Sequence, residues 1–259
     1  MPMTYYITSR GRVHNQITLN NLPPEIRDQV WLAVYESEAK EYRKIHPRIF
    51  VCPDQSHGLS WKRQFIMTSS KTDYICLLDD DIRFNKKRLD DVTKMVPADD
   101  QTVLDAFALL GSWLVSGDFA HVGMITRGGA NRILTPYVET TRMMHVLAYN
   151  RRIFINEGIR FDRLICMSDF DVTLQLLEKG YNNRLLASCL SDPSKSNSTG
   201  GCSIYRTPDL LEESAHGLAK LHPLYVSTRL KITEEDTWKG FGGLRTDVTV
   251  QWKRCYHGS

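Results

Sequence analysis

Three consecutive carboxylates, Asp79, Asp80 and Asp81, follow an apolar run that begins at Tyr74. The run is typical of a buried strand, and three adjacent Asp residues repel one another and favour strands poorly. Hard oxygen ligands suit Mg²⁺ or Mn²⁺, and the carboxyl end of a strand is where an open α/β sheet binds ligands. Because residues two apart in an extended chain face the same side, Asp79 and Asp81 are predicted to face one cation. A solvated turn is the alternative interpretation.

A second acidic motif, Ser168-Asp169-Phe170-Asp171, opens the clearest helical pattern of the second half. One of its carboxylates is a candidate general base, which would remove a proton from an attacking hydroxyl. The alternative is structural, because Ser and Asp cap helices and acidic residues suit the positive end of a helix. The motif taken alone does not separate these interpretations.

Several cations and one glycine pair are placed where an anion could bind. Arg10 and Arg12 follow the first strand, and Lys62-Arg63 lies near the start of a helix. Backbone N–H groups of the Gly200-Gly201 loop could approach a phosphate, although no established phosphate-loop pattern surrounds them. The C-terminal region interleaves basic and aromatic residues, which suits either a nucleic acid or a solvated basic face. These residues are Lys239, Arg245, Lys253, Arg254, Trp238, Phe241, Trp252 and Tyr256.

The elements that must position these residues alternate along the first part of the chain. Predicted strands are 3–8, 48–52, 74–79, 120–126 and 143–149, with 152–155 as a pairing partner or edge. Predicted helices are 23–44, 60–70, 102–116 and 169–179, with a helix and loop over 84–100, a flexible loop over 191–203 and a short helix from about 210. The β-α-β-α-β order predicts a parallel sheet with right-handed crossovers.

Composition excludes some classes of protein. The chain has 259 residues, 42% hydrophobic and 24% charged, which is ordinary for a globular protein of one large or two small domains. Its net charge of +3 permits an anionic partner without requiring one. Six scattered cysteines without a CxxC pair favour neither a zinc site nor a disulfide framework, and they indicate a reducing cytoplasm. No apolar run approaches the roughly 20 residues that span a bilayer.

In their order, these motifs resemble the GT-A glycosyltransferases, most closely the inverting family-two type. The resemblance rests on the basic loop after the first strand, the Asp-x-Asp strand end, and the pattern from Phe161-Asp162 through Asp169 to Gly180-Tyr181. It implies an α/β fold in which helices flank a Rossmann-like, mostly parallel central sheet, with a small antiparallel sheet. Residues 1–205 would form the nucleotide-sugar transferase core. Residues 206–259 would form a helical, basic and aromatic extension packed on the same domain.

The resemblance also implies roles for individual residues. Asp79 and Asp81 would hold Mn²⁺ or Mg²⁺ on the diphosphate of a UDP-sugar, with Asp192 as a third ligand because the family's usual His is absent. Asp169 matches the catalytic base, although Ser168 replaces the usual preceding Glu. The predicted donor-binding residues are Thr8, Arg10, Arg12, Asp54, Arg63 and Asp80. The predicted acceptor-binding residues are Arg127, Asp171, Gly200, Gly201 and Arg206.

The second half also resembles the phage-encoded TET-associated glycosyltransferases, which are thought to add sugars to hydroxymethylated pyrimidines in DNA. The run from Gly200 to Thr207, Glu213-Ser214 and His222-Pro223 carry this resemblance. The predicted function is therefore metal-dependent, inverting transfer of a sugar to 5-hydroxymethylcytosine in DNA, in the cytoplasm of a phage-infected host. Carbohydrate, lipid or protein acceptors are alternatives. A nucleotidyltransferase and a non-enzymatic DNA-binding accessory protein are the alternatives from other classes, and the oligomeric state stays open.

Overall fold

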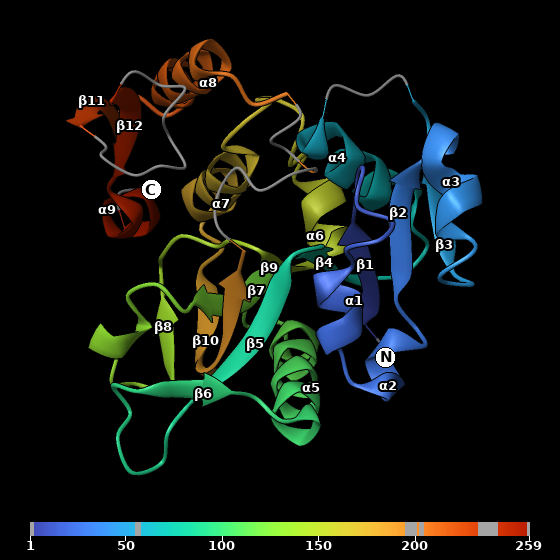
Figure 1. The fold of residues 1–259 in the computed structure, drawn as a ribbon. Coiled ribbons are helices and arrows are strands. Elements are labelled where there is room, and N and C mark those ends of the chain that lie inside the picture. Colours follow the sequence, from blue (N-terminus) through green and yellow to red (C-terminus); the bar gives the residue numbers. More distant parts are fainter. Residues whose placement is uncertain (1–2, 55–57, 195–200, 202–204, 233–242, 258–259) are drawn as a thin grey trace.

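A ten-stranded sheet forms the centre of the molecule in the computed structural model, which describes residues 3–54, 58–194, 201, 205–232 and 243–257. The strand order is β3-β2-β1-β4-β9-β7-β10-β5-β6, and β8 pairs with β10. The strands are β1 Thr4–Thr8, β2 Trp31–Tyr35, β3 Ile49–Cys52, β4 Tyr74–Asp79, β5 Ile82–Lys87, β6 Met95–Pro97, β7 His121–Thr126, β8 Tyr137–Glu139, β9 Val146–Asn150 and β10 Asn183–Pro193. Helices cover both faces (Figure 1).

The strands β3, β2, β1 and β4 run parallel, as do β7 and β10, whereas β9 lies antiparallel between β4 and β7. Thr8 at the end of β1 pairs with Asp79 at the end of β4. The carboxyl ends of the parallel strands therefore meet at one edge, next to the three carboxylates. The predicted fold class is confirmed, including a small antiparallel sheet formed by β11 Val226–Ile232 and β12 Leu244–Val250.

The apolar run of β4 is buried on both faces, which explains its continuous hydrophobicity. Cys76 and Leu78 pack into one core cluster, and Ile75 and Leu77 pack into the other. The first cluster includes residues of α1 Ile17–Asn21, α2 Pro24–Arg27, α3 Glu36–Tyr42 and α5 Asp100–Ser116. The second includes residues of α4 Leu59–Ser69, α6 Arg151–Asn156 and α7 Ser168–Glu178. Both flanking layers thus anchor the strand that carries the carboxylates (Figure 1).

A third core cluster joins the C-terminal elements to α7. Phe170, Leu174 and Leu177 of α7 pack with residues of α8 Pro208–Leu221, the β11–β12 hairpin and α9 Trp252–His257. The C-terminal elements lie beside α7 and away from the central sheet (Figure 1). The division of the chain at residue 205 stays a prediction.

The predicted helix over 23–44 is wrong. The structure has α2, then β2, then α3 in this segment. The apolar run that starts at Trp31 lies between β1 and β3, and its last four residues are buried. A short apolar run of this kind fits a buried strand and a helix equally well. This run forms a strand because it pairs with β1 on one side and β3 on the other.

Two further expectations are wrong, one over residues 84–100 and one over residues 152–155. Residues 84–100 contain β5 and β6 in place of a helix, because the polar β5 pairs with β10 on one side and β6 on the other. Residues 152–155 belong to α6, which begins where the Asn150 side chain accepts hydrogen bonds from the N–H groups of Arg152 and Ile153. An Asn before a short apolar run is a helix-start signal that the prediction did not use.

The other predicted elements are confirmed with small shifts at their ends. The strands at 3–8, 48–52, 74–79 and 120–126 correspond to β1, β3, β4 and β7, and the helices at 60–70, 102–116 and 169–179 to α4, α5 and α7. The predicted loop over 191–203 begins later than expected, because β10 continues to Pro193. Residues 195–200 and 202–204 of this predicted loop lie outside the described residues. Within the described parts of the chain, no helix is long and apolar enough to cross a membrane.

Candidate active site

A cavity of about 530 Å³ lies at the carboxyl ends of β1 and β4. One part of its lining, here called the sheet side, includes Thr8, Arg10, Arg12, Lys62, Arg63, Asp79, Asp80, Asp81 and His145. Another part, here called the C-terminal side, includes Arg142, Asp169, Phe170, Tyr205, Arg206, Leu211, Arg245, Thr246 and Asp247. The cavity therefore brings together the two acidic motifs that lie far apart in the sequence.

Asp80 is the most buried of the three consecutive carboxylates. Its side chain is 5% exposed, accepts a hydrogen bond from Ser9 Oγ at 2.6 Å, and pairs with Arg12 Nη1 at 2.5 Å. Burial outweighs these contacts and raises the pKa of Asp80 to about 6. Asp80 thus ties the turn after β4 to the loop after β1, while its two neighbours remain more exposed.

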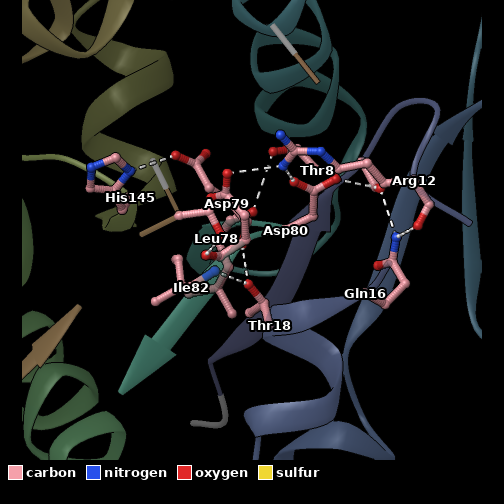
Figure 2. A network of polar contacts seen from close by, with 12 residues as sticks. Thr8, Arg12, Gln16, Thr18, Leu78, Asp79, Asp80, Ile82 and His145 are labelled. Atoms are coloured by element: carbon pink, nitrogen blue, oxygen red, sulfur yellow. Dashed lines mark hydrogen bonds and ion pairs between the residues drawn. The ribbon is translucent and has the colours of Figure 1, made fainter. Parts of the chain in front are cut away.

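Asp79 lies between two cationic or polar partners on the sheet side. Its Oδ1 pairs with Arg63 Nη2 at 2.6 Å, and its Oδ2 lies 2.9 Å from Nδ1 of His145. Burial alone would raise the pKa of Asp79, but Arg63 and His145 outweigh it and hold the pKa well below its usual range. Figure 2 shows the His145 ring approaching Asp79 from the side opposite Asp80.

Hydrogen bonds from Thr18 of α1 to backbone groups fix the turn that presents these carboxylates (Figure 2). Thr18 Oγ1 donates to the carbonyl of Asp79 at 2.5 Å and accepts from the N–H of Ile82 at 2.8 Å. The N–H of Thr18 donates to the carbonyl of Asp80 at 3.1 Å. Because both ends of the turn are held, the three side chains keep separate directions.

The donor set at Asp79 and Asp81 suits a divalent cation. Both side chains keep about a fifth of their area exposed (21% and 20%), and both line the cavity. Burial is the largest cause that raises the pKa of Asp81, and repulsion by the neighbouring Asp79 carboxylate raises it further. Mg²⁺ is usually held by one or two carboxylates plus substrate phosphates, and this pair fits that pattern. Among the described residues, no three His, Cys, Asp or Glu side chains are grouped to hold a metal without such help.

Lys62 and Arg12 are cations of the sheet side whose positions are fixed by buried partners. Lys62 Nζ donates to the carbonyl of Ser9 at 2.5 Å and lies 3.9 Å from the centre of the Tyr35 ring. Burial lowers the pKa of Lys62 to about 8. Arg12 reaches Asp81 as well as Asp80, with Nη1 3.0 Å from Asp81 Oδ2. Positive charge is therefore concentrated where the strands end.

Asp169 lies at the start of α7 on the C-terminal side of the cavity. Its side chain is 19% exposed, and its Oδ2 lies 3.5 Å from Nη2 of Arg142. The Arg142 guanidinium stacks on the Phe170 ring at 3.8 Å, which fixes it beside the carboxylate. Asp169 is therefore a partly exposed carboxylate within the cavity, as a general base must be.

Asp171 is not where an acceptor-binding residue would lie, and that prediction is corrected. Its carboxylate is fully buried and absent from the cavity lining. It lies 2.8 Å from His222 Nε2 and 3.0 Å from Arg163 Nη2, and it accepts from Gln175 Nε2 at 2.9 Å. Burial alone would lower the pKa of His222, but Asp171 and Glu178 outweigh it and raise it. Asp171 thus ties α7 to the end of α8.

Asp192 and Arg127 also lie outside the cavity lining. Asp192 Oδ2 accepts from Arg127 Nη1 at 2.9 Å and from Asn85 Nδ2 at 3.1 Å. Asp192 of β10 and Asn85 of β5 lie on paired strands, and Arg127 follows β7. Asp192 is absent from the cavity lining, and its role as a third metal ligand stays a prediction. The acceptor role predicted for Arg127 likewise has no support from its position.

The remaining predicted site residues divide into three groups. Thr8, Arg10, Gly201 and Arg206 line the cavity. Asp54 lies in an adjoining pocket with Arg10 and Tyr35, where its carboxylate accepts from the N–H and Oγ of Ser37. Gly200 lies outside the described residues. The roles predicted for these residues stay predictions.

Three ionisable residues of the cavity lining were not identified from the sequence: His145, Arg142 and Asp247. His145 has a φ of 62°, in the left-handed region that is uncommon for residues other than Gly, and this backbone sets the ring beside Asp79. Arg142 and Asp247 occur in segments with no motif. No local pattern identifies any of the three, because their places depend on packing between distant segments.

The family model described as "TET-Associated Glycosyltransferase" matches residues 3–190, more than half of the chain. A comparison with curated proteins finds no match. Among solved structures, S. aureus TarS 1-349 with UDP-GlcNAc is 14% identical with a TM-score of 0.55, covering 85% of this chain and 66% of that one. The Pyrobaculum calidifontis mannosyltransferase PcManGT with GDP-Man and Mn²⁺ is 11% identical with a TM-score of 0.57, covering 92% and 67%.

GalNAc-T7 with UDP, GalNAc and Mn²⁺ is 9% identical with a TM-score of 0.53, covering 84% of this chain and 48% of that one. At these identities the likenesses show a shared fold. The chain spans about two thirds or less of the length of these solved chains. Together with the family match, the glycosyltransferase fold and the paired acidic motifs lead to one conclusion: the chain belongs to the TET-associated glycosyltransferase family and is a glycosyltransferase.

Proposed function

We propose that this protein transfers a sugar from a nucleotide diphosphate sugar to a hydroxyl group with inversion at the anomeric carbon, and that the acceptor is 5-hydroxymethylcytosine in DNA. One observation carries the proposal. Asp79, Asp81 and Asp169 line the same cavity. A single displacement needs, within one site, a group that stabilises the leaving diphosphate and a group that deprotonates the nucleophile.

The sheet side would bind the donor diphosphate. When bound between Asp79 and Asp81, Mn²⁺ or Mg²⁺ supplies Lewis-acid stabilisation of the negative charge that develops on the leaving group. Arg12 and Arg63 hold these carboxylates in place and add positive charge to the same side. The complexes of the similar structures, with UDP-GlcNAc, with GDP-Man and Mn²⁺, and with UDP and Mn²⁺, support a nucleotide-sugar donor and a divalent cation.

The C-terminal side would bind the acceptor. Asp169 accepts the proton of the acceptor hydroxyl as that oxygen attacks the anomeric carbon from the face opposite the diphosphate. Arg142, 3.5 Å from Asp169, holds the carboxylate toward the cavity. The family name supports a modified DNA base as the acceptor, and a base in duplex DNA would have to leave the stack to enter the cavity. The phage-infected host as the setting stays a prediction.

Mass spectrometry tests the proposal directly. An oligonucleotide containing 5-hydroxymethylcytosine is incubated with the protein, MnCl₂ and a panel of UDP- and GDP-sugars. The expected result is a mass gain of one hexose or N-acetylhexosamine with one donor. Asp79→Ala and Asp81→Ala should each reduce this transfer by at least about 10³-fold, because the leaving group loses its electrostatic stabilisation.

Asp90→Ala is the matched control, since Asp90 is an exposed carboxylate that pairs with Arg88 and does not line the cavity. Unchanged transfer by both cavity variants would refute the metal assignment. Transfer to an oligosaccharide, lipid or protein but not to the oligonucleotide would refute the acceptor. If no donor reacts, and UDP with Mn²⁺ does not raise the thermal midpoint, the transferase function itself is refuted.

A further inference from the structure

An arginine on an aromatic ring lines the C-terminal side of the cavity. The guanidinium carbon of Arg142 lies 3.8 Å from the centre of the Phe170 ring. That ring is 9% exposed and packs against Trp252, with 5.6 Å between the ring centres. Arg142 keeps 40% of its side chain exposed and lines the cavity. A ligand that enters the cavity here therefore meets the guanidinium, which lies over the aromatic ring.

The fold fixes the backbone on both sides of Arg142. The buried Asn183 side chain accepts from the N–H of Thr141 at 3.0 Å and donates to the Thr141 carbonyl at 2.6 Å. Met143, the next residue along the chain, is fully buried in the second core cluster. Arg142 is therefore preorganised at the cavity, and preorganisation lowers the entropy that binding costs.

A second arginine that packs on aromatic rings, Arg184, shows what distinguishes Arg142. Arg184 lies 4.4 Å from the centre of the Phe119 ring and donates to Glu139 Oε1 from Nε at 2.8 Å and from Nη2 at 2.6 Å. Arg142 Nη2 lies 3.5 Å from Asp169 Oδ2, and among the described residues its buried Nε has no hydrogen-bond partner. Arg184 is thus a structural ion pair, whereas Arg142 is held mainly by its ring contact.

The planar cation of Arg142 suits an aromatic ligand. Guanidinium planes stack on the π-faces of nucleobases, and unpaired bases are commonly bound in this way. A saturated sugar ring has no π-face to offer. Because Asp169 lies beside Nη2 of the same guanidinium, a base stacked on Arg142 would have the candidate general base as its neighbour.

We propose that the guanidinium of Arg142 is the platform on which the acceptor base stacks, so that the hydroxymethyl group of the base lies next to Asp169. This inference rests on the proposed DNA acceptor and names the residue that recognises it as an aromatic base. Stacking tolerates different bases, because every base has a π-face. Arg142 therefore selects a nucleobase over a saturated acceptor and does not distinguish cytosine from uracil.

Steady-state sugar transfer to two acceptors tests the platform. One is an oligonucleotide containing 5-hydroxymethylcytosine, and the other is the free 5-hydroxymethyl nucleoside, which has no phosphate. Arg142→Lys keeps the positive charge beside Asp169 and removes the plane. It should raise KM about tenfold for both acceptors with little change in kcat, because one stacking contact to the base is lost.

Arg184→Lys is the matched control. It removes a guanidinium from aromatic rings outside the cavity lining, so it should change neither KM nor kcat. Arg142→Gln separates the plane from the charge, because it removes both. KM should rise as in Arg142→Lys, and kcat should also fall, because Asp169 loses its neighbouring cation. Calorimetry of nucleoside binding, below the thermal midpoint of each variant, gives the same comparison without turnover.

An unchanged KM in Arg142→Lys would overturn the platform. An increase for the oligonucleotide alone would also overturn it, because that result assigns Arg142 to a phosphate. A fall in kcat at unchanged KM would leave Arg142 as a positioning residue for Asp169 and overturn the platform as well.

Failure of the proposed function is a distinct result, in which the wild type transfers sugar to neither acceptor. Calorimetry still decides the platform in that case. The wild type should bind the nucleoside more tightly than Arg142→Lys does, and equal binding or no binding by the wild type would refute the platform.

Discussion

The two sides of the cavity are held in place by different kinds of interaction. On the sheet side, the carboxylates follow a strand that pairs with a neighbour on each side, and the Thr18 hydroxyl fixes the turn by hydrogen bonds to its backbone. On the C-terminal side, α7 and α8 are joined through side chains, namely a shared apolar cluster and the buried Asp171 with His222 and Arg163. The sheet side is therefore built into the pairing of the strands. The C-terminal side depends on packing and ion pairs between side chains.

This difference predicts different consequences of substitution. Removing a cavity carboxylate should remove activity and leave the fold intact on either side. Removing a buried side chain that joins the C-terminal elements should lower stability first. The following experiments test this contrast.

Asp169→Asn is expected to have the largest effect. An amide does not accept the proton of the acceptor hydroxyl, so kcat should fall by about 10³-fold, equivalent to about 4 kcal/mol of transition-state stabilisation. Initial rates of sugar transfer measure the loss, and calorimetry should show unchanged donor affinity. Asp162→Asn, at a carboxylate paired with exposed Arg160, is the control and should keep its rate. A mutant rate close to wild type would remove Asp169 from the mechanism.

Asp171→Ala should reduce the free energy of unfolding by about 3–5 kcal/mol, because it leaves Arg163 and His222 without their buried carboxylate. Urea unfolding measures the change. The exposed Asp105→Ala should stay within about 0.5 kcal/mol of the wild type. If both variants behave alike, the side-chain network does not hold the C-terminal side.

Gly58→Ala tests a contact between the sheet side and the C-terminal side. It should lower the free energy of unfolding by about 1–3 kcal/mol. Gly58 has a φ of 101°, and an added Cβ would lie 2.8 Å from the Tyr205 ring. Tyr205 Oη also accepts from the N–H of Leu59 at the start of α4. Gly111→Ala in α5 is the control, because an added Cβ there meets no atom within 4 Å and Ala favours helices. Thermal unfolding of both variants gives the comparison.

The pH dependence of stability should show the smallest effect. The pKa of His222 is raised in the folded protein by Asp171 and Glu178, against the effect of burial. Its contribution is therefore complete below the unfolded pKa of about 6.5 and is lost as the pH rises through the higher folded value. Urea unfolding of the wild type and His222→Gln should show a difference that shrinks with rising pH. A difference that grows with pH would contradict this sign.

Local sequence patterns predicted the elements with the strongest periodicity, such as β4 and α7, and the acidic residues at their ends. They failed where a short segment is shaped by its neighbours. Residues 31–35 became a strand because β1 and β3 lie on either side, and the polar β5 pairs with two strands. Asp171 matched an acidic motif, yet packing against α8 buries it. Asp169 and Asp171 belong to the same acidic helix start, so the sequence pattern does not distinguish the carboxylate in the cavity from the buried one.

The sequence by itself determined that a buried strand ends in carboxylates and that a later helix begins with Asp169, because these features depend on residues next to one another. Only the tertiary structure decided which of those carboxylates face the cavity, which cations hold them, and that Arg142 lies beside Asp169. Each of those outcomes depends on contacts between segments far apart in the chain, and no local pattern specifies such contacts.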